Sequence, residues 1–336
     1  MSKVTVESPA NIAFIKYWGV KDLALYLPYN SSISMNLSGC LTTTTAQIDD
    51  SASEDTIHIK EKNTFIPLSK THGKNAKAYD QIARLRNMLG VRQYIKIYTE
   101  NSFPSDAGIA SSASGFSALT AAILLAFGKK DIFEDKKALS RLVRLAGSGS
   151  AVRSVYGGFV EFSKGNDQEA VAHQIAPETH WDIVDLIAVV STVKKDISSS
   201  EGHTRVESSP YFHTRLKELP DRINHTRKAI RDKDFSVLGP LIEADTISMH
   251  TVMMTSEPPI FYWQPGTLEV MNSVTQWRRE GLESYFSIDA GANVHVICEK
   301  KNAQALEKRL QGLSLVQSTI YNVPCKGTHE IQKHLL

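Results

Sequence analysis

A run of small residues between an expected strand and an expected helix restricts the fold of this chain more than any other feature. It reads PSDAGIASSASG over residues 104–115, follows a β-branched run at 94–99 and leads into an Ala- and Leu-rich segment at 117–127. Small side chains let backbone N–H groups converge on an anion, and the positive end of the following helix adds to that attraction. No Gly-Lys-Ser/Thr follows, so this is not a Walker A loop. The run predicts a phosphate cradle or, alternatively, a turn that only leads into a helix.

The remaining pattern predicts a mixed α and β chain whose character changes near residue 185. Strands are expected in the first half at 4–15, 42–48, 56–59, 94–99 and 158–162, and helices at 77–89, 117–127 and 136–145. After a buried strand within 181–191, helices are expected at 211–231, 235–254, 268–280 and 303–310, and strands at 284–288, 294–298 and 316–323. The second half therefore predicts helices on one face of an antiparallel sheet. A length of 336 residues favours two domains, which we place at 1–185 and 186–336.

Charge and cysteine content exclude several classes of protein. The net charge of +2 gives no broad positive field for nucleic acid or acidic membranes. The three cysteines have no CxxC spacing, so neither a disulfide framework nor a zinc site is indicated. The first residues do not have the pattern of a secretory signal, and no apolar run approaches the roughly 20 residues that span a bilayer. We expect a cytoplasmic protein with neither nucleic-acid nor membrane partners.

Three further motifs combine polar residues with small ones. In SPANIAFIKYWG, strand alternation would direct Asn11 and Lys16 into a cleft, although an edge strand with a surface lysine would read the same way. In GSGSAVRS, Arg153 would make a bidentate contact to a carboxylate or phosphate. In SIDAGAN, Asp289 would hold a substrate hydroxyl or would simply form a turn. Each motif alone leaves both interpretations open.

Together, the order and wording of these motifs resemble the mevalonate diphosphate decarboxylase family of the GHMP kinase superfamily. The resemblance covers nearly the whole chain and is carried by PANIAFIKYWG, LPYNSSISMNL, SFPSDAGIASSASG, GSGSAVRSVYGGFVEF, APETHWDIVDLIAVVSTVKKDISS, EPPIFYW, and SIDAG with Asn293. It implies an α+β, two-domain GHMP kinase fold: a ribosomal-S5-like N-terminal domain with the loop 104–115, and a ferredoxin-like C-terminal domain with Asp289. The active site would lie in the cleft between them, and family members commonly form homodimers.

The resemblance also implies an enzyme of isoprenoid biosynthesis that uses ATP and Mg2+. The tertiary 3-hydroxyl of a phosphorylated mevalonate would take the γ-phosphoryl group, and phosphate would then leave as the carboxylate departs as CO2. By this resemblance, Asp289 serves as base or orienting acceptor for the hydroxyl. Arg153 holds the substrate carboxylate with support from Asn11, and Lys16 offsets charge near the transferred group. No protein ligand for the metal is assigned.

The binding residues implied by the resemblance form two sets. The set expected at the ATP phosphates is Ser105, Ala107, Gly108, Ala110, Ser111, Ser112 and Ser114. The set expected at the substrate is Tyr17, Lys21, Ser148, Gly149, Ser150, Arg153, Ser199, Ser200 and His203. His250 belongs to no metal-spaced group, so we expect it to be a packing or surface residue.

A departure from the family pattern bears on the substrate. After KYWG the family usually carries two basic residues, whereas here Val20 precedes Lys21. Many bacterial members also place an arginine at the position aligned with Ser200. Enclosing a diphosphate without paired cations is costly, which favours the smaller anion. We therefore predict conversion of mevalonate 5-phosphate to isopentenyl phosphate. The alternative is mevalonate 5-diphosphate to isopentenyl diphosphate, if Lys21, Arg205 or His203 restores the charge.

Two other functions fit parts of the pattern. One is a superfamily kinase that stops at the phosphorylated product, and the other is a nucleotide-binding regulator that has lost catalysis. The presence of Lys16, Arg153 and Asp289 in their family contexts favours the decarboxylase over both.

Overall fold

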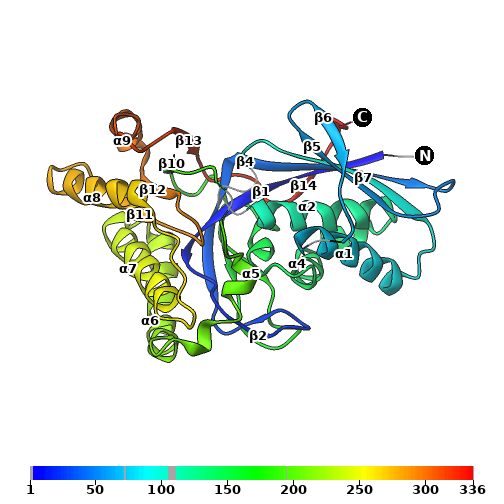
Figure 1. Cartoon of the computed structure of the whole chain (residues 1–336), viewed down its shortest axis with the longest axis horizontal. Helices are drawn as coiled ribbons and strands as arrows, with labels where there is room; N and C mark the ends of the chain where they lie inside the picture. The colour runs from blue at the N-terminus through cyan, green and yellow to red at the C-terminus, as the bar shows by residue number, and fades with distance from the viewer. Residues whose placement is uncertain (1–2, 72, 105–110, 194, 336) are drawn as a thin grey trace.

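A computed structural model of the chain describes residues 3–71, 73–104, 111–193 and 195–335 (Figure 1). Its strands are β1 Lys3–Ile15, β2 Val20–Asp22, β3 Leu27–Pro28, β4 Ser32–Asp49, β5 Thr56–Glu61, β6 Thr64–Pro67, β7 Tyr94–Asn101, β8 Phe159–Phe162, β9 Ala172–Ala176, β10 Ile183–Val189, β11 Tyr285–Ser287, β12 Val294–Glu299, β13 Ser318–Asn322 and β14 His329–Ile331. Its helices are α1 Gly73–Leu89, α2 Ser111–Ala126, α3 Lys130–Glu134, α4 Lys136–Leu145, α5 Ser199–Gly202, α6 Phe212–Asp232, α7 Phe235–Met254, α8 Pro265–Arg279 and α9 Lys300–Gln311, with 3-10 turns at Gly149–Ser154 and Val206–Ser208.

Among the described residues, the first part of the chain and the late strand β14 build an eight-stranded sheet in the order β14-β1-β4-β7-β5-β6, with β8 pairing to β4 and β9 to β8. The ladders are antiparallel except that β5 runs parallel to β7. Helices α1, α2 and α4 lie together on one face of this sheet (Figure 1). α2 is buried on nearly all sides, because β1 and β4 cover it from one direction and its neighbouring helices from the other. An Ala- and Leu-rich composition suits such an enclosed helix.

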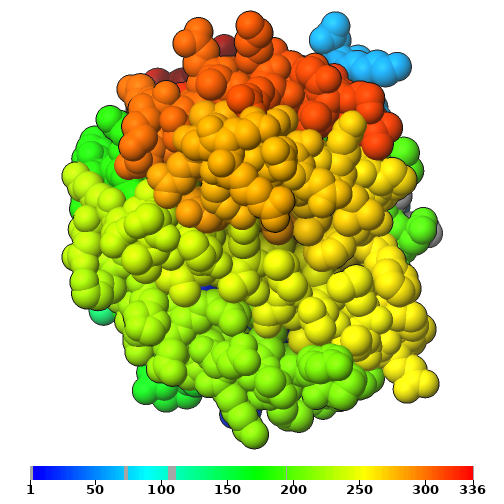
Figure 2. Space-filling view, turned by 90° about the vertical axis from the view of Figure 1, so that its left-hand side faces the viewer, coloured from blue at the N-terminus to red at the C-terminus, as the bar shows by residue number. Residues whose placement is uncertain are grey.

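The second part of the chain builds a four-stranded antiparallel sheet in the order β11-β12-β10-β13. Strand alternation divides β10 between two cores. Val184 and Leu186 pack with α8 and α9, whereas Ile183 and Ile187 face the core shared with the first sheet and with α6 and α7. Figure 2 shows that α6, α7 and α8 cover this end of the molecule. The α+β class expected from the sequence is confirmed.

Strands β4 and β14 are among the elements that differ from the sequence-based expectation. Strand β4 begins at Ser32, ten residues before the expected start at Thr42, and its polar early residues are buried. The Asn36 side chain there donates from Nδ2 to the Tyr156 carbonyl, a tertiary contact that the local sequence pattern does not reveal. At the other end of the chain, β14 returns to pair with β1 in the first sheet. Among the described residues, no helix combines the length and apolarity needed to cross a membrane.

Candidate active site

A buried ion pair joins the two sheets at the centre of the molecule. Lys16 directly follows β1, and its Nζ lies 2.5 Å from Asp289 Oδ1 and 2.6 Å from Ser287 Oγ. Lys16 is 1% exposed, whereas the Asp289 side chain keeps 24% of its surface exposed. Burial opposes ionisation of Asp289, but the nearby charges of Lys16 and Arg153 outweigh it and lower the pKa of this carboxyl. Asp289 is therefore an ionised, partly accessible carboxylate at neutral pH.

Arg153 lies in the 3-10 turn after α4 and is held by two groups from the first sheet. Its Nε donates to Asn11 Oδ1 at 3.3 Å and its Nη1 to Ser32 Oγ at 2.6 Å. Asn11 in turn donates from Nδ2 to the Ser150 carbonyl at 3.1 Å and to Ser154 Oγ at 3.0 Å. Burial lowers the pKa of Arg153 to about 10, so the guanidinium keeps its charge at neutral pH. The fork of Arg153 is thus fixed in place beside the Lys16–Asp289 pair.

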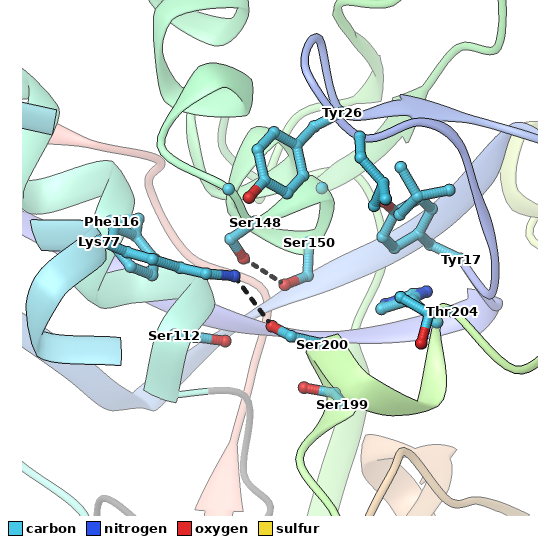
Figure 3. A pocket seen from close by; sticks show the side chains of 15 residues that line it. Tyr17, Tyr26, Lys77, Ser112, Phe116, Ser148, Ser150, Ser199, Ser200 and Thr204 are labelled. Atoms are coloured by element: carbon cyan, nitrogen blue, oxygen red, sulfur yellow. Dashed lines mark hydrogen bonds between the residues drawn. The ribbon is translucent and has the colours of Figure 1, made fainter. Parts of the chain in front are cut away.

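A cavity of about 240 Å³ opens near these residues, and Figure 3 shows it from close by. Its lining residues are Tyr17, Val20, Leu23, Tyr26, Lys77, Ser112, Phe116, Gly147, Ser148, Gly149, Ser150, Ser199, Ser200, His203 and Thr204. Eight of these lining residues carry a hydroxyl group, which can donate a hydrogen bond to a polar ligand. Gly149 has a specific steric role, because a Cβ at this position would lie 2.6 Å from the Tyr17 ring. The glycine lets Tyr17 pack against the 3-10 turn that carries Arg153.

Lys77 supplies positive charge to this cavity and was not singled out in the sequence. It reaches from α1 toward α5, with Nζ 3.2 Å from Ser200 Oγ and 5.6 Å from the centroid of the Tyr26 ring (Figure 3). Among the described lining residues, it is the only lysine or arginine. No local motif surrounds Lys77, so it could be recognised in the sequence only as a lysine within an expected helix.

Lys21, Arg205 and His203 were the side chains expected to replace the basic residue that is absent at Val20, and the structure places them differently. Lys21 is exposed on β2 and does not line the cavity. Arg205 donates to Glu201 and to the Pro258 carbonyl. His203 does line it, with its ring 4.5 Å from Tyr17, and its Nδ1 accepts the Gly19 N–H at 2.9 Å. Burial lowers the pKa of His203 to about 3, so its imidazole is neutral at physiological pH.

Most of the other residues predicted to bind the substrate line this cavity, and one does not. Tyr17, Ser148, Gly149, Ser150, Ser199 and Ser200 line the cavity together with His203. Ser148 and Ser150 hydroxyls lie 3.1 Å apart, close enough to hold one ligand oxygen between them. Arg153 lies outside this lining, beside Asn11. The cavity therefore gathers residues from the segment that follows β1 and from β2, α1, α2, the 3-10 turn and α5.

The predicted phosphate cradle is described only in part. Ser105, Ala107, Gly108 and Ala110 lie outside the described residues. Ser111 begins α2, and the next residue, Ser112, lines the cavity. Ser114 is fully buried, and its hydroxyl accepts a hydrogen bond from Thr42 at 2.6 Å and donates one to the Ser111 carbonyl at 3.4 Å. This hydroxyl therefore joins α2 to β4 instead of facing the cavity. Within the described part of the chain, no three His, Cys, Asp or Glu side chains are grouped to hold a metal ion.

The sequence of this chain matches known families and proteins over most of its length. Residues 8–173 match the family described as diphosphomevalonate decarboxylase-like N-terminal domain, and residues 185–333 match mevalonate 5-diphosphate decarboxylase C-terminal domain. The diphosphomevalonate decarboxylase of Candida albicans is 35% identical over 98% of this chain and 91% of its own length. The Bos taurus diphosphomevalonate decarboxylase is 34% identical over 87% of this chain and 76% of its own length.

The chain is also similar to solved structures of mevalonate diphosphate decarboxylases. Mevalonate diphosphate decarboxylase from Staphylococcus aureus superposes with a TM-score of 0.89 at 33% identity and covers 98% of both chains. The enzyme from Enterococcus faecalis gives a TM-score of 0.88 at 34% identity, with 98% of this chain and 99% of that chain covered. A structure described as MDDEF in complex with MVAPP, AMPPCP and magnesium gives the same TM-score of 0.88 and the same coverage.

Proposed function

Because the chain belongs to the diphosphomevalonate decarboxylase family of the GHMP kinase superfamily, we propose that it converts mevalonate 5-diphosphate to isopentenyl diphosphate. The reaction uses ATP and releases ADP, phosphate and CO2. The observation that carries the proposal is the Lys16–Asp289 ion pair, with Arg153 beside it and a cavity lined by Lys77 nearby. This set provides a carboxylate for a hydroxyl, a fork for a carboxylate and a cation for a phosphate.

The preference for the monophosphate that the sequence suggested is not supported. The relatives found by comparison are diphosphomevalonate decarboxylases, and one solved neighbour contains MVAPP. The physical premise was incomplete, since it counted only cations close to Val20 in the sequence. The fold brings Lys77 from α1 into the cavity lined by Val20. The cavity therefore contains a cation that the motif-based argument overlooked.

In the first step, the substrate's 3-hydroxyl oxygen attacks the γ-phosphorus of ATP. Asp289 is ionised and partly exposed, so it can accept the hydroxyl proton as the new P–O bond forms and the bond to ADP breaks. Lys16 holds this carboxylate in one orientation, and Ser287 helps to fix the lysine, since Lys16 Nζ donates to both residues. Positioning and charge compensation of this kind carry most of phosphoryl transfer.

In the second step, the phosphorylated 3-oxygen leaves as phosphate while the bond to the carboxylate breaks. The electron pair of that C–C bond forms the alkene, and the carboxylate departs as CO2. Arg153 would hold the carboxylate until this point, because its charge is retained at neutral pH and its orientation is fixed by Asn11 and Ser32.

The diphosphate of the substrate would occupy the cavity. Lys77 would contact its negative charge, and the hydroxyls of Ser148, Ser150 and Ser200 would donate to its oxygens. Charge-assisted hydrogen bonds of this kind are about twice as strong as neutral ones. Val20, which replaces a basic residue of the family pattern, contributes only apolar surface. This makes Lys77 the main source of charge for the phosphate chain among the described residues.

ATP would bind with its phosphates near the start of α2, where Ser111 and Ser112 lie. The oxygen donors at the cleft, the Ser112 hydroxyl and the Asp289 carboxylate, are of the type that suits Mg2+. When bound, Mg2+ neutralises charge on the nucleotide phosphates.

A cytoplasmic location, a homodimer and a domain division near residue 185 stay predictions from the sequence. Light scattering during size-exclusion chromatography would test the homodimer.

The proposal is tested by measuring ADP and CO2 release together. With mevalonate 5-diphosphate and ATP, we expect one CO2 for each ADP. ADP formation without CO2 would show a kinase that stops at the phosphorylated product. No turnover of the diphosphate or the monophosphate would instead point to a regulator without catalysis.

A further inference from the structure

Helix α7 contacts the backbone on both sides of the Lys16–Asp289 pair. Asp245 Oδ2 accepts the backbone N–H of Lys16 at 2.7 Å. Five residues further along the same helix, His250 Nε2 lies 3.2 Å from the carbonyl oxygen of Ile288, the residue before Asp289. Asp245 is 0% and His250 1% exposed. One helix therefore touches the main chain of both partners through two buried side chains.

The Asp245 contact is rigid because two arginines from α6 hold this carboxylate. Arg215 Nη1 lies 2.9 Å from Asp245 Oδ1, and Arg222 Nη1 lies 3.2 Å from the same atom. Arg215 also donates to the carbonyl oxygen of Lys16 at 3.4 Å. The backbone of Lys16 is thus held at its N–H by α7 and at its carbonyl by α6.

The His250 contact lies where the strand no longer constrains the chain. The ladder between β11 and β12 ends with the pair Ser287 and His295, so Ile288 and Asp289 lie beyond it. The His250 ring packs 4.9 Å from the Trp263 ring, which fixes its plane. Burial lowers the pKa of His250 to about 4, so the ring is neutral at physiological pH. A carbonyl oxygen only accepts hydrogen bonds, so Nε2 carries the hydrogen and donates it to Ile288.

We propose that His250 is a positioning residue that acts together with Asp245 to set, from one helix, the distance between the Lys16 ammonium and the Asp289 carboxylate. The inference rests on the proposed role of Asp289 as acceptor of the substrate proton. Proton acceptors work only within hydrogen-bond reach, and a misplacement of about 1 Å can reduce the rate about a hundredfold. The sequence suggested only a packing or surface role for His250, because its contact depends on a residue 38 positions away.

The test uses two substitutions at position 250 in the full chain. His250→Phe keeps the ring volume but removes the donor, and His250→Gln keeps an N–H donor at a similar reach. We expect His250→Phe to lower kcat about tenfold or more, while the KM values for ATP and for mevalonate 5-diphosphate stay within about twofold. His250→Gln should restore kcat to within about threefold of the unmodified enzyme.

Met249→Ala is the matched control, because Met249 is 2% exposed, neighbours His250 and packs in the core without a polar contact to the pair. It should lower Tm at least as much as His250→Phe without a comparable fall in kcat below that Tm. The inference is overturned if His250→Phe keeps kcat, if His250→Gln fails to rescue it, or if Met249→Ala lowers kcat equally. If Asp289→Asn also keeps its activity, the role proposed for Asp289 is wrong and not merely that of His250.

Discussion

Lys16 and Asp289 are 273 residues apart in the chain, yet Nζ of the lysine lies 2.5 Å from Oδ1 of the aspartate. The lysine follows the first strand of one sheet, and the aspartate follows β11, the edge strand of the other. The pair therefore forms only when the two sheets are assembled. Because the lysine is buried and the carboxylate is partly exposed, the charge of Asp289 is maintained at a surface that a substrate can reach.

Replacing Asp289 by asparagine should abolish most phosphoryl transfer. The neutral amide cannot take the hydroxyl proton, and general bases contribute on the order of a hundredfold or more to kcat. ATP affinity and the circular dichroism spectrum should remain close to those of the unmodified protein. Single-turnover assays of ADP formation measure the effect, and near-normal turnover would show that another group accepts the proton.

Replacing Arg153 by lysine should impair both binding and decarboxylation. Lysine keeps the charge but loses the planar fork that contacts Asn11 and Ser32. We expect a higher KM for mevalonate 5-diphosphate and a lower rate of CO2 release, with the KM for ATP little changed. Steady-state kinetics with both products monitored would reveal this, whereas unchanged kinetics would make Arg153 a structural residue.

Replacing Lys77 by methionine should weaken binding of the phosphorylated substrate. Methionine keeps most of the apolar stem while removing the cation from the cavity. A hydrogen bond to a charged group contributes about 1.5–3 kcal/mol, so KM for the diphosphate should rise roughly tenfold or more. Lys130→Met on α3, where the lysine side chain is 69% exposed, serves as control and should leave KM unchanged. Equal KM values for the two variants would remove Lys77 from the site.

Acidification should destabilise the protein through His250. Its pKa is about 4 in the folded state against 6.5 in the unfolded chain, so between these values only the unfolded state binds the proton. The free energy of unfolding therefore falls as pH drops from about 6.5 toward 4, by roughly 3 kcal/mol from this residue. His203, which is only partly buried, adds in the same direction. Urea unfolding at several pH values gives the free energy of unfolding as a function of pH. This free energy should fall less steeply with decreasing pH for His250→Gln than for the unmodified protein, and an identical pH dependence would contradict the assignment.

The sequence allowed most of the secondary structure to be predicted, because those elements follow local periodicity. The strands near 94–99 and 294–298 and the helices near 136–145 and 235–254 agree with the structure within two residues at each end. Strand β14 was missed because its three residues have no pattern of their own and are fixed only by pairing with β1.

The candidate site was predictable where its residues lie in motifs and not where they depend on packing. Lys16, Arg153 and Asp289 could be named from their family contexts, and the structure brings them together. Lys77 could not, because its place in the cavity follows from how α1 packs against α2. The same reason explains the preference for the monophosphate, which the comparisons do not support and which depended on charges near one stretch of sequence.

The central claim is tested most directly by comparing kcat/KM for mevalonate 5-diphosphate and mevalonate 5-phosphate with saturating ATP. ADP and CO2 should be followed in the same reactions. The second phosphate adds charge that Lys77 can contact, so we expect the diphosphate to be preferred by about tenfold or more, with equal amounts of ADP and CO2. A clear preference for the monophosphate, or ADP without CO2 from either ester, would contradict the account.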